Sequence, residues 1–212
     1  MSNLCRVNIL GIGISAITMA EALDQISRWI EQRSCHYVSL CTVHTVMEGQ
    51  RDPAMCQALK GASLTAPDGM PLVWLGKWLS GNEVNRVYGP DLMLALCELS
   101  TKQGYSHYFY GGAAGVVEQL AWRLQQRFPG LKVAGTYTPP FRSGVSLEEP
   151  DIITQINQSQ PDIIWVGLGT PKQDLWMAAH RSLLQAPVLI GVGAAFDFHT
   201  GRVSQAPPWM QR

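Results

Sequence analysis

The stretch SLTAPDGMPLVWLG, residues 63–76, places one acid, Asp68, between a strand-like segment and an apolar, helix-like segment. A carboxylate at such a position is costly to bury, and packing does not explain it. Asp68 is therefore either a reactive group at the end of a strand or part of an Asp-Gly turn. The sequence raises it as the first candidate for chemistry.

Polar residues and glycines also follow the other strand-like segments. The candidates are Thr42, His44, Asp68, Gly111, Gly112, Tyr137, Gly169, Gln173 and Asp197. In a parallel sheet the carboxyl ends of all strands lie along one edge, where open α/β sheets bind ligands. This pattern predicts a ligand cleft at that edge.

Two glycine-containing segments are candidates for binding phosphate or sugar. YGGAAG, residues 110–115, enters a helix directly, where glycine admits a phosphate and the helix N-terminus favours anions. A tight strand-to-helix turn would have the same sequence. In GLGTPKQ, Gly169 allows close approach, and Gln173 near a helix start suits hydrogen bonds to a sugar or diphosphate.

Arg86 and Asp197 extend this set. Arg86 in NRVYGPD precedes a predicted helix start, and its guanidinium suits a diphosphate, although an exposed loop arginine is the alternative. Asp197 in GAAFDFHTG suits a ribose or a base edge, or else it caps the following turn. Asp197 and His199 also form a conceivable metal pair, but no third ligand and no D-x-D pair is evident. We therefore predict no metal.

Hydrophobic periodicity indicates which elements position these residues. The predicted strands cover 6–15 (a strand or hairpin), 36–43, 63–67, 107–110, 131–136, 162–169 and 187–193. The predicted helices cover 18–30, 52–61, 70–81, 90–103, 116–128, 150–159 and 172–184. Residues 136–150 form the longest predicted loop. The strands lack clean alternation, which indicates an α/β fold whose parallel sheet is covered on both faces by crossover helices.

Composition narrows the function classes. The chain has 212 residues, enough for a single domain, with 16 basic and 16 acidic residues and no basic stripe. This balance argues against nucleic-acid binding. Five cysteines without C-x-x-C spacing indicate a reduced, cytoplasmic compartment. No apolar run is long enough to predict a transmembrane helix.

Taken together, six stretches resemble the WecG/TagA/CpsF family of bacterial glycosyltransferases. They are APDGMPLVW, RVYGPDL, YFYGG, FPGLKVAGTY, PDIIWVGLGTPKQDLW and VLIGVGAAFDFHTGRVSQAPPWMQR. The resemblance implies a Rossmann-like, mostly parallel α/β enzyme that inverts the anomeric centre without a metal or other cofactor. It implies transfer from a UDP-sugar to a polyprenyl-diphosphate-linked saccharide in cell-surface polysaccharide synthesis, by a peripheral protein at the cytoplasmic face of the plasma membrane.

The resemblance also implies roles for individual residues. Asp68 matches the aspartate proposed as the catalytic base, which would take the proton of the attacking acceptor hydroxyl. Thr42, Arg86 and Gln173 match polar positions around the sugars and the diphosphate. Asp197 with Tyr137 would then suit the uridine.

The sequence departs from the family pattern in two places. Many members have asparagine where this chain has His44, so the donor sugar stays open among N-acetylmannosamine-type, uronic acid and hexose. Family chains usually continue beyond APPWMQR with a basic membrane-docking segment. We therefore expect residues 1–212 to form a single domain without that segment, with weak turnover but retained nucleotide binding.

Two other functions fit less well. A non-catalytic UDP-sugar-binding subunit would use the same cleft but not Asp68. An NAD(P)-dependent oxidoreductase would fit the fold, but GIGIS at 11–15 is a poor dinucleotide fingerprint. The oligomeric state stays open. Trp74, Trp78 and Leu79 near a helix end could form an interface between copies, but packing in the core is the favoured interpretation.

Overall fold

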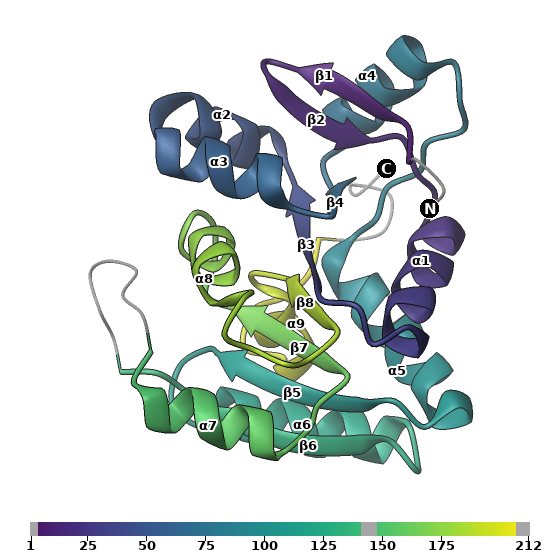
Figure 1. The fold of residues 1–212 in the computed structure, drawn as a ribbon. Helices are drawn as coiled ribbons and strands as arrows, with labels where there is room; N and C mark the ends of the chain where they lie inside the picture. The colour runs from purple at the N-terminus through teal and green to yellow at the C-terminus, as the bar shows by residue number, and fades with distance from the viewer. Residues whose placement is uncertain (1–3, 141–147, 207–212) are drawn as a thin grey trace.

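The structure is a computed structural model that describes residues 4–140 and 148–206. Its centre is a six-stranded, wholly parallel sheet with strand order β4-β3-β8-β7-β5-β6 (Figure 1). The strands are β3 (His36–Cys41), β4 (Leu64–Pro67), β5 (Ser106–Gly111), β6 (Lys132–Tyr137), β7 (Ile163–Gly167) and β8 (Val188–Gly191). Part of the predicted loop over 136–150, and the C-terminal APPWMQR from residue 207 on, lie outside the described residues.

Helices cover both faces of this sheet, as the unbroken apolar strands predicted. One face is covered by α1 (Met19–Glu31), α5 (Gly89–Gln103), α6 (Val116–Arg127) and α9 (Ala195–Thr200). On the other face lie α7 (Pro150–Gln158) and α8 (Lys172–His180), with α3 (Pro53–Gly61) against α8. The α/β fold class with a parallel sheet is thus confirmed. Each described helix is too short or too polar to span a membrane.

A small third layer lies beside β4. An antiparallel hairpin of β1 (Arg6–Ile9) and β2 (Ile12–Ser15) packs with α2 (Val43–Arg51), α3 and α4 (Met70–Ser80) around a separate apolar cluster. The hairpin lies next to α4 at one end of the molecule (Figure 1). This layer brings α2 and α4 to the carboxyl end of β3 and β4.

Two helices were not predicted. β3 ends at Cys41, two residues earlier than predicted, because Thr42 caps α2: its hydroxyl accepts from the Thr45 amide at 3.3 Å, and the Thr45 hydroxyl accepts from the Thr42 amide. A threonine in place of the usual Glu or Gln concealed this capping box. The short helix α9 puts Asp197 and His199 on a helical turn, where the sequence suggested a loop.

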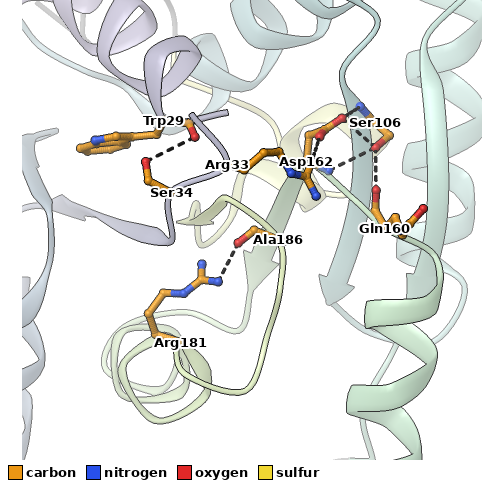
Figure 2. Close-up of polar contacts among 8 residues, drawn as sticks. All are labelled: Trp29, Arg33, Ser34, Ser106, Gln160, Asp162, Arg181 and Ala186. Carbon is orange, nitrogen blue, oxygen red and sulfur yellow. Dashed lines mark hydrogen bonds and ion pairs between the residues drawn. The ribbon is translucent and has the colours of Figure 1, made fainter. Parts of the chain in front are cut away.

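The loops at the amino ends of the strands are tied together by polar contacts (Figure 2). Asp162, just before β7, pairs with Arg33 at 2.6 Å and accepts from the amide of Ser106, the first residue of β5, at 2.8 Å. Arg181 donates to the carbonyls of Ala186 and His36. These contacts hold the loops at the amino edge together.

The centre of the sheet depends on two glycines at its carboxyl edge. Gly111 has φ +116°, and a Cβ there would lie 2.6 Å from the carbonyl oxygen of Gly167. The Gly112 amide donates to that same oxygen at 2.9 Å. A Cβ at Gly167 would in turn lie 2.5 Å from the Phe196 ring. Close packing between β5, β7 and α9 therefore requires both glycines.

We predict that Gly111→Ala lowers the free energy of unfolding by roughly 2–5 kcal/mol, because a backbone clash adds to left-handed strain. Urea unfolding would measure this loss. Gly130→Ala is the matched control, since Gly130 has φ +92° but open space around its Cβ position. We expect the control to lose only about 1 kcal/mol. Equal losses in the two variants would contradict the packing argument.

Candidate active site at the carboxyl edge of the sheet

A cavity of about 180 Å³ lies at the carboxyl ends of β3, β4 and β8. Polar groups from four separate segments line it, among them Thr42, Thr45, Asp68, Tyr88, Thr170 and Gln173. The glycine-rich backbone at Gly191 and Gly193 forms its floor beside Val192. The cavity thus brings together Thr42, Asp68 and Gln173 from the predicted set, and it is our candidate active site.

Asp68 is held at this cavity by a backbone hydrogen bond and by the guanidinium of Arg86. Its amide donates to the carbonyl of Cys41 at 2.8 Å, which fixes the turn from β4 into α4. Its Oδ1 lies 3.2 Å from Nε and 3.1 Å from Nη2 of Arg86. Burial raises the pKa of Asp68 above its ordinary value, although Arg86 and the Gly89 amide oppose that rise. A carboxylate with a raised pKa next to a cavity suits a general base.

Arg86 is held in place by a second contact. Its guanidinium lies 4.0 Å from the centroid of the Tyr88 ring, a cation–π arrangement. Its Nε also donates to the backbone carbonyl of Asp68. The side chain is half-buried, so the alternative of a freely solvated loop arginine does not describe it. Tyr88 was not among the predicted site residues. Its position two residues after Arg86 could have indicated it, because an aromatic ring so close in the chain can contact the guanidinium.

Four helices begin at this cavity. α2 starts after Thr42, α4 after Gly69, α5 after Tyr88 and α8 after Pro171. The first turns of α4, α5 and α8 have no side-chain cap, and the first amide of α5, that of Gly89, donates to the Asp68 carboxylate. Helix N-termini attract anions, and four pointing at one cavity create a site that favours phosphate groups.

Gln173 and Asp174 organise the start of α8. Gln173 is buried, and its Oε1 accepts from the Gly193 amide at 2.9 Å, which links α8 to the loop after β8. The Asp174 carboxylate accepts from Ser39 at 2.5 Å and from Thr170 at 3.1 Å. Burial raises the pKa of Asp174. No local sequence pattern indicated Asp174, because its partner Ser39 is 135 positions away.

The remaining predicted residues lie around the cavity or away from it. His44, on α2, is exposed, and its Nδ1 is 3.9 Å from Glu48. Gly169 has φ +75° and open space around it, next to Thr170. Gly111 and Gly112 pack against β7, which agrees with the tight-turn alternative for YGGAAG.

Tyr137 and Asp197 do not line this cavity. Tyr137 ends β6, the opposite edge strand from β4, and five strand spacings separate the two strands by about 24 Å. Its ring packs against Tyr110 at 5.7 Å. Asp197 lies in α9, whose His199 contacts the carbonyl of Pro90 at 3.1 Å through Nε2. His199 therefore joins α9 to α5, and the described residues contain no cluster of three metal-ligating side chains.

A larger groove of about 840 Å³ lies at the opposite, amino edge of the sheet, between α1 and β1. Arg6 and His36 are among its lining residues, and Nη2 of Arg6 and both ring nitrogens of His36 already have hydrogen-bond partners. Arg6 donates to the carbonyls of Ala62 and Ser63, and His36 contacts Ser63 and Ser34. The smaller cavity has the half-buried carboxylate of Asp68 and the helix N-termini at its wall, so chemistry is better placed there.

An open parallel α/β sheet with a carboxylate and several helix N-termini at its carboxyl edge defines a protein that acts on a phosphate-bearing ligand. Comparison with known sequences is more specific. Residues 7–212 match the Glycosyl transferase WecG/TagA/CpsF family. The chain belongs to this family and is a glycosyltransferase, as its six motif stretches indicated.

Two relatives show how far this similarity extends. A Bacillus spizizenii protein is 26% identical over 184 residues, 87% of this chain and 70% of the relative. A Staphylococcus aureus protein is 26% identical over 208 residues, 97% of this chain and 80% of the relative. Each is named N-acetylglucosaminyldiphosphoundecaprenol N-acetyl-beta-D-mannosaminyltransferase.

We predict that Asp68→Asn does not destabilise the protein at neutral pH. The folded-state pKa of Asp68 is raised, so ionisation of this acid costs stability, and that cost grows as pH rises through the pKa. The variant should therefore melt at an equal or higher temperature than the parent, with a difference that is larger at pH 8 than at pH 4. Differential scanning calorimetry measures both. The exposed acid Asp24, changed to Asn, is the control, and a strongly destabilised Asp68→Asn would show that the acid is structural.

Proposed function

We propose that this glycosyltransferase moves a sugar from a UDP-sugar to a polyprenyl-diphosphate-linked saccharide, with inversion at the anomeric carbon and without a metal. The observation that carries the proposal is the half-buried Asp68–Arg86 pair beside a cavity at which four helices begin. The names of the two relatives support the lipid-linked acceptor. They also make N-acetylmannosamine the first donor sugar to test.

The helix N-termini and Arg86 suit the diphosphate of the donor. A UDP leaving group gains negative charge as the bond to the anomeric carbon breaks. Fixed amide dipoles and a guanidinium stabilise such charge without reorganising. In this proposal Thr42, at the cap of α2, and Gln173, at the start of α8, lie near the sugar and the diphosphate.

Asp68 supplies the base. The acceptor hydroxyl attacks the anomeric carbon on the face opposite UDP, the new carbon–oxygen bond forms as the old one breaks, and the hydroxyl proton passes to the Asp68 carboxylate. The raised pKa of Asp68 makes it a better proton acceptor than an ordinary aspartate. The Arg86 contact keeps the carboxylate ionised and oriented while it waits for the acceptor.

The proposal also assigns roles to the other predicted site residues. Asp197 and Tyr137 are proposed for the uridine, although Tyr137 lies at the far edge of the sheet. Gly111, Gly112 and Gly169 are proposed to leave space for the donor. His44, exposed on α2, is proposed to face the substrate sugars. The lipid-linked acceptor implies that the protein works as a peripheral protein at the cytoplasmic membrane surface, as a monomer or a homo-oligomer.

We predict that Asp68→Asn loses at least about 100-fold in sugar transfer, because the acceptor proton has no base. The variant should bind UDP with nearly unchanged affinity. Isothermal titration with UDP, in buffer with and without EDTA, measures binding, and radiolabelled donor measures transfer. EDTA should change neither quantity. Full transfer by Asp68→Asn would point to another base, and normal UDP binding without any transfer by the parent would favour a non-catalytic binding subunit.

We predict that Arg86→Gln moves the acidic limb of the kcat/KM profile to higher pH. Transfer requires ionised Asp68, so activity rises with pH through the pKa of that acid. Arg86 lowers this pKa against the effect of burial, and its removal lets the pKa rise further. The control is Arg51→Gln, which removes an exposed arginine paired with Glu48 on α2. An acidic limb that stays in place in Arg86→Gln would mean that Asp68 is not the group being titrated.

A further inference from the structure

We propose that the outer face of α4 docks onto an anionic lipid bilayer and so places the candidate active site at the membrane surface. This inference rests on the proposed function, since a polyprenyl-linked acceptor lies in a bilayer. The supporting observation is that α4, the helix that starts beside Asp68, presents two exposed tryptophans on one face.

The outer face of α4 is apolar and exposed. Trp74 and Trp78, one helical turn apart, are 61% and 80% exposed. Leu75 and Leu79 extend the face, also exposed. The opposite side of the helix is buried against β1, β2 and β4 through Leu72, Val73 and Gly76. Large apolar side chains gathered on one exposed face mark an interaction surface.

The residue types of this face favour a lipid surface. Tryptophan concentrates at membrane–water interfaces, where its ring lies among the headgroups. α4 contains no Asp or Glu, and its one charged residue, Lys77, lies exposed between the two tryptophans. A lysine between tryptophans is complementary to anionic headgroups.

The position of α4 links this face to the site. The helix begins at Met70, with Gly69 as its N-cap, immediately after Asp68. At the neighbouring start of α2, Val43 is exposed as well, and the backbones of Gly69 and Thr42–Val43 lie in contact. The hairpin of β1 and β2 packs on α4 (Figure 1). A bilayer against α4 would therefore lie next to the place where the acceptor hydroxyl must meet Asp68.

A second copy of this chain is the rival occupant. A twofold contact centred on Lys77 would bring the two copies of this lysine close together, because each subunit presents the same patch to the other. Like charges oppose such a contact, whereas anionic lipid headgroups would neutralise them. The charge of the face therefore favours the bilayer.

Vesicle flotation tests the proposal. The protein is mixed with vesicles of phosphatidylglycerol and phosphatidylethanolamine, and the double variant Trp74→Gln/Trp78→Gln is compared with the parent. We expect at least about a tenfold loss of the bound fraction in the variant. Trp122→Gln is the matched control, because Trp122 is also 61% exposed but lies on α6, at the far end of the sheet from α4 (Figure 1). Lys77→Glu is a second variant, and it should weaken binding by repulsion alone.

Several results would overturn the proposal. They are a parent that does not bind these vesicles, a double variant that binds as well as the parent, and an equal loss in Trp122→Gln. A parent dimer that the double variant breaks, with vesicle binding unchanged, would assign the face to a second copy instead. Melting temperatures identify any variant that has merely unfolded. If the double variant is unfolded, vesicle binding by Lys77→Glu tests the proposal, and unchanged binding by that variant would overturn it.

Transfer assays separate this inference from the proposed function. A short-chain, water-soluble acceptor does not need a membrane, so the double variant should use it as fast as the parent. With a long-chain acceptor in vesicles, the variant should lose activity in proportion to lost binding. If the parent binds vesicles through α4 but transfers to neither acceptor, the proposed function fails and the docking surface stands.

Discussion

The contact between Asp68 and Arg86 determines how the carboxyl edge of the sheet is built. A carboxylate this deeply placed needs a partner, and the partner comes from a segment 18 residues further along the chain. The segment between them is α4 and its return loop, which leads back along the sheet, where the Val87 amide donates to Pro67 in β4. This backbone bond and the Asp68 amide bond to Cys41 fix where α4 leaves the sheet and where α5 begins, and the ion pair orients the acid between them. The two helix starts and the acid are thus positioned by one local arrangement.

The parallel sheet then adds the other components of the site. Because every strand runs the same way, each following helix starts at the same edge, and α2 and α8 join α4 and α5 around the cavity. Gln173 and Asp174 fasten α8 to β8 and β3 through Gly193 and Ser39. Burial of these polar groups is tolerated because each has a specific partner. At the opposite edge, the Asp162 network ties the loops before β5 and β7 together.

The two edges of the sheet also differ in what they expose. At the β4 end, α4 and the hairpin present large apolar side chains directly beside the candidate active site. At the β6 end, the exposed surface of α6 has a single comparable residue, Trp122. Under the proposed function, with its lipid-linked acceptor, this asymmetry would place the proposed base near an apolar phase.

The sequence by itself determined the local elements and the class of the protein. Capping signals such as Thr18 with Glu21, and Pro53 after Asp52, marked helix starts, because capping needs only neighbouring residues. Apolar strands without alternation determined the two-sided parallel sheet, and the ordered motifs determined the family. Only the tertiary structure decided which strand ends meet: it joined Thr42, Asp68 and Gln173, put Tyr137 five strands from Asp68, and paired Asp174 with Ser39. Strand order arises from pairing between distant segments, and no local pattern of residues encodes it.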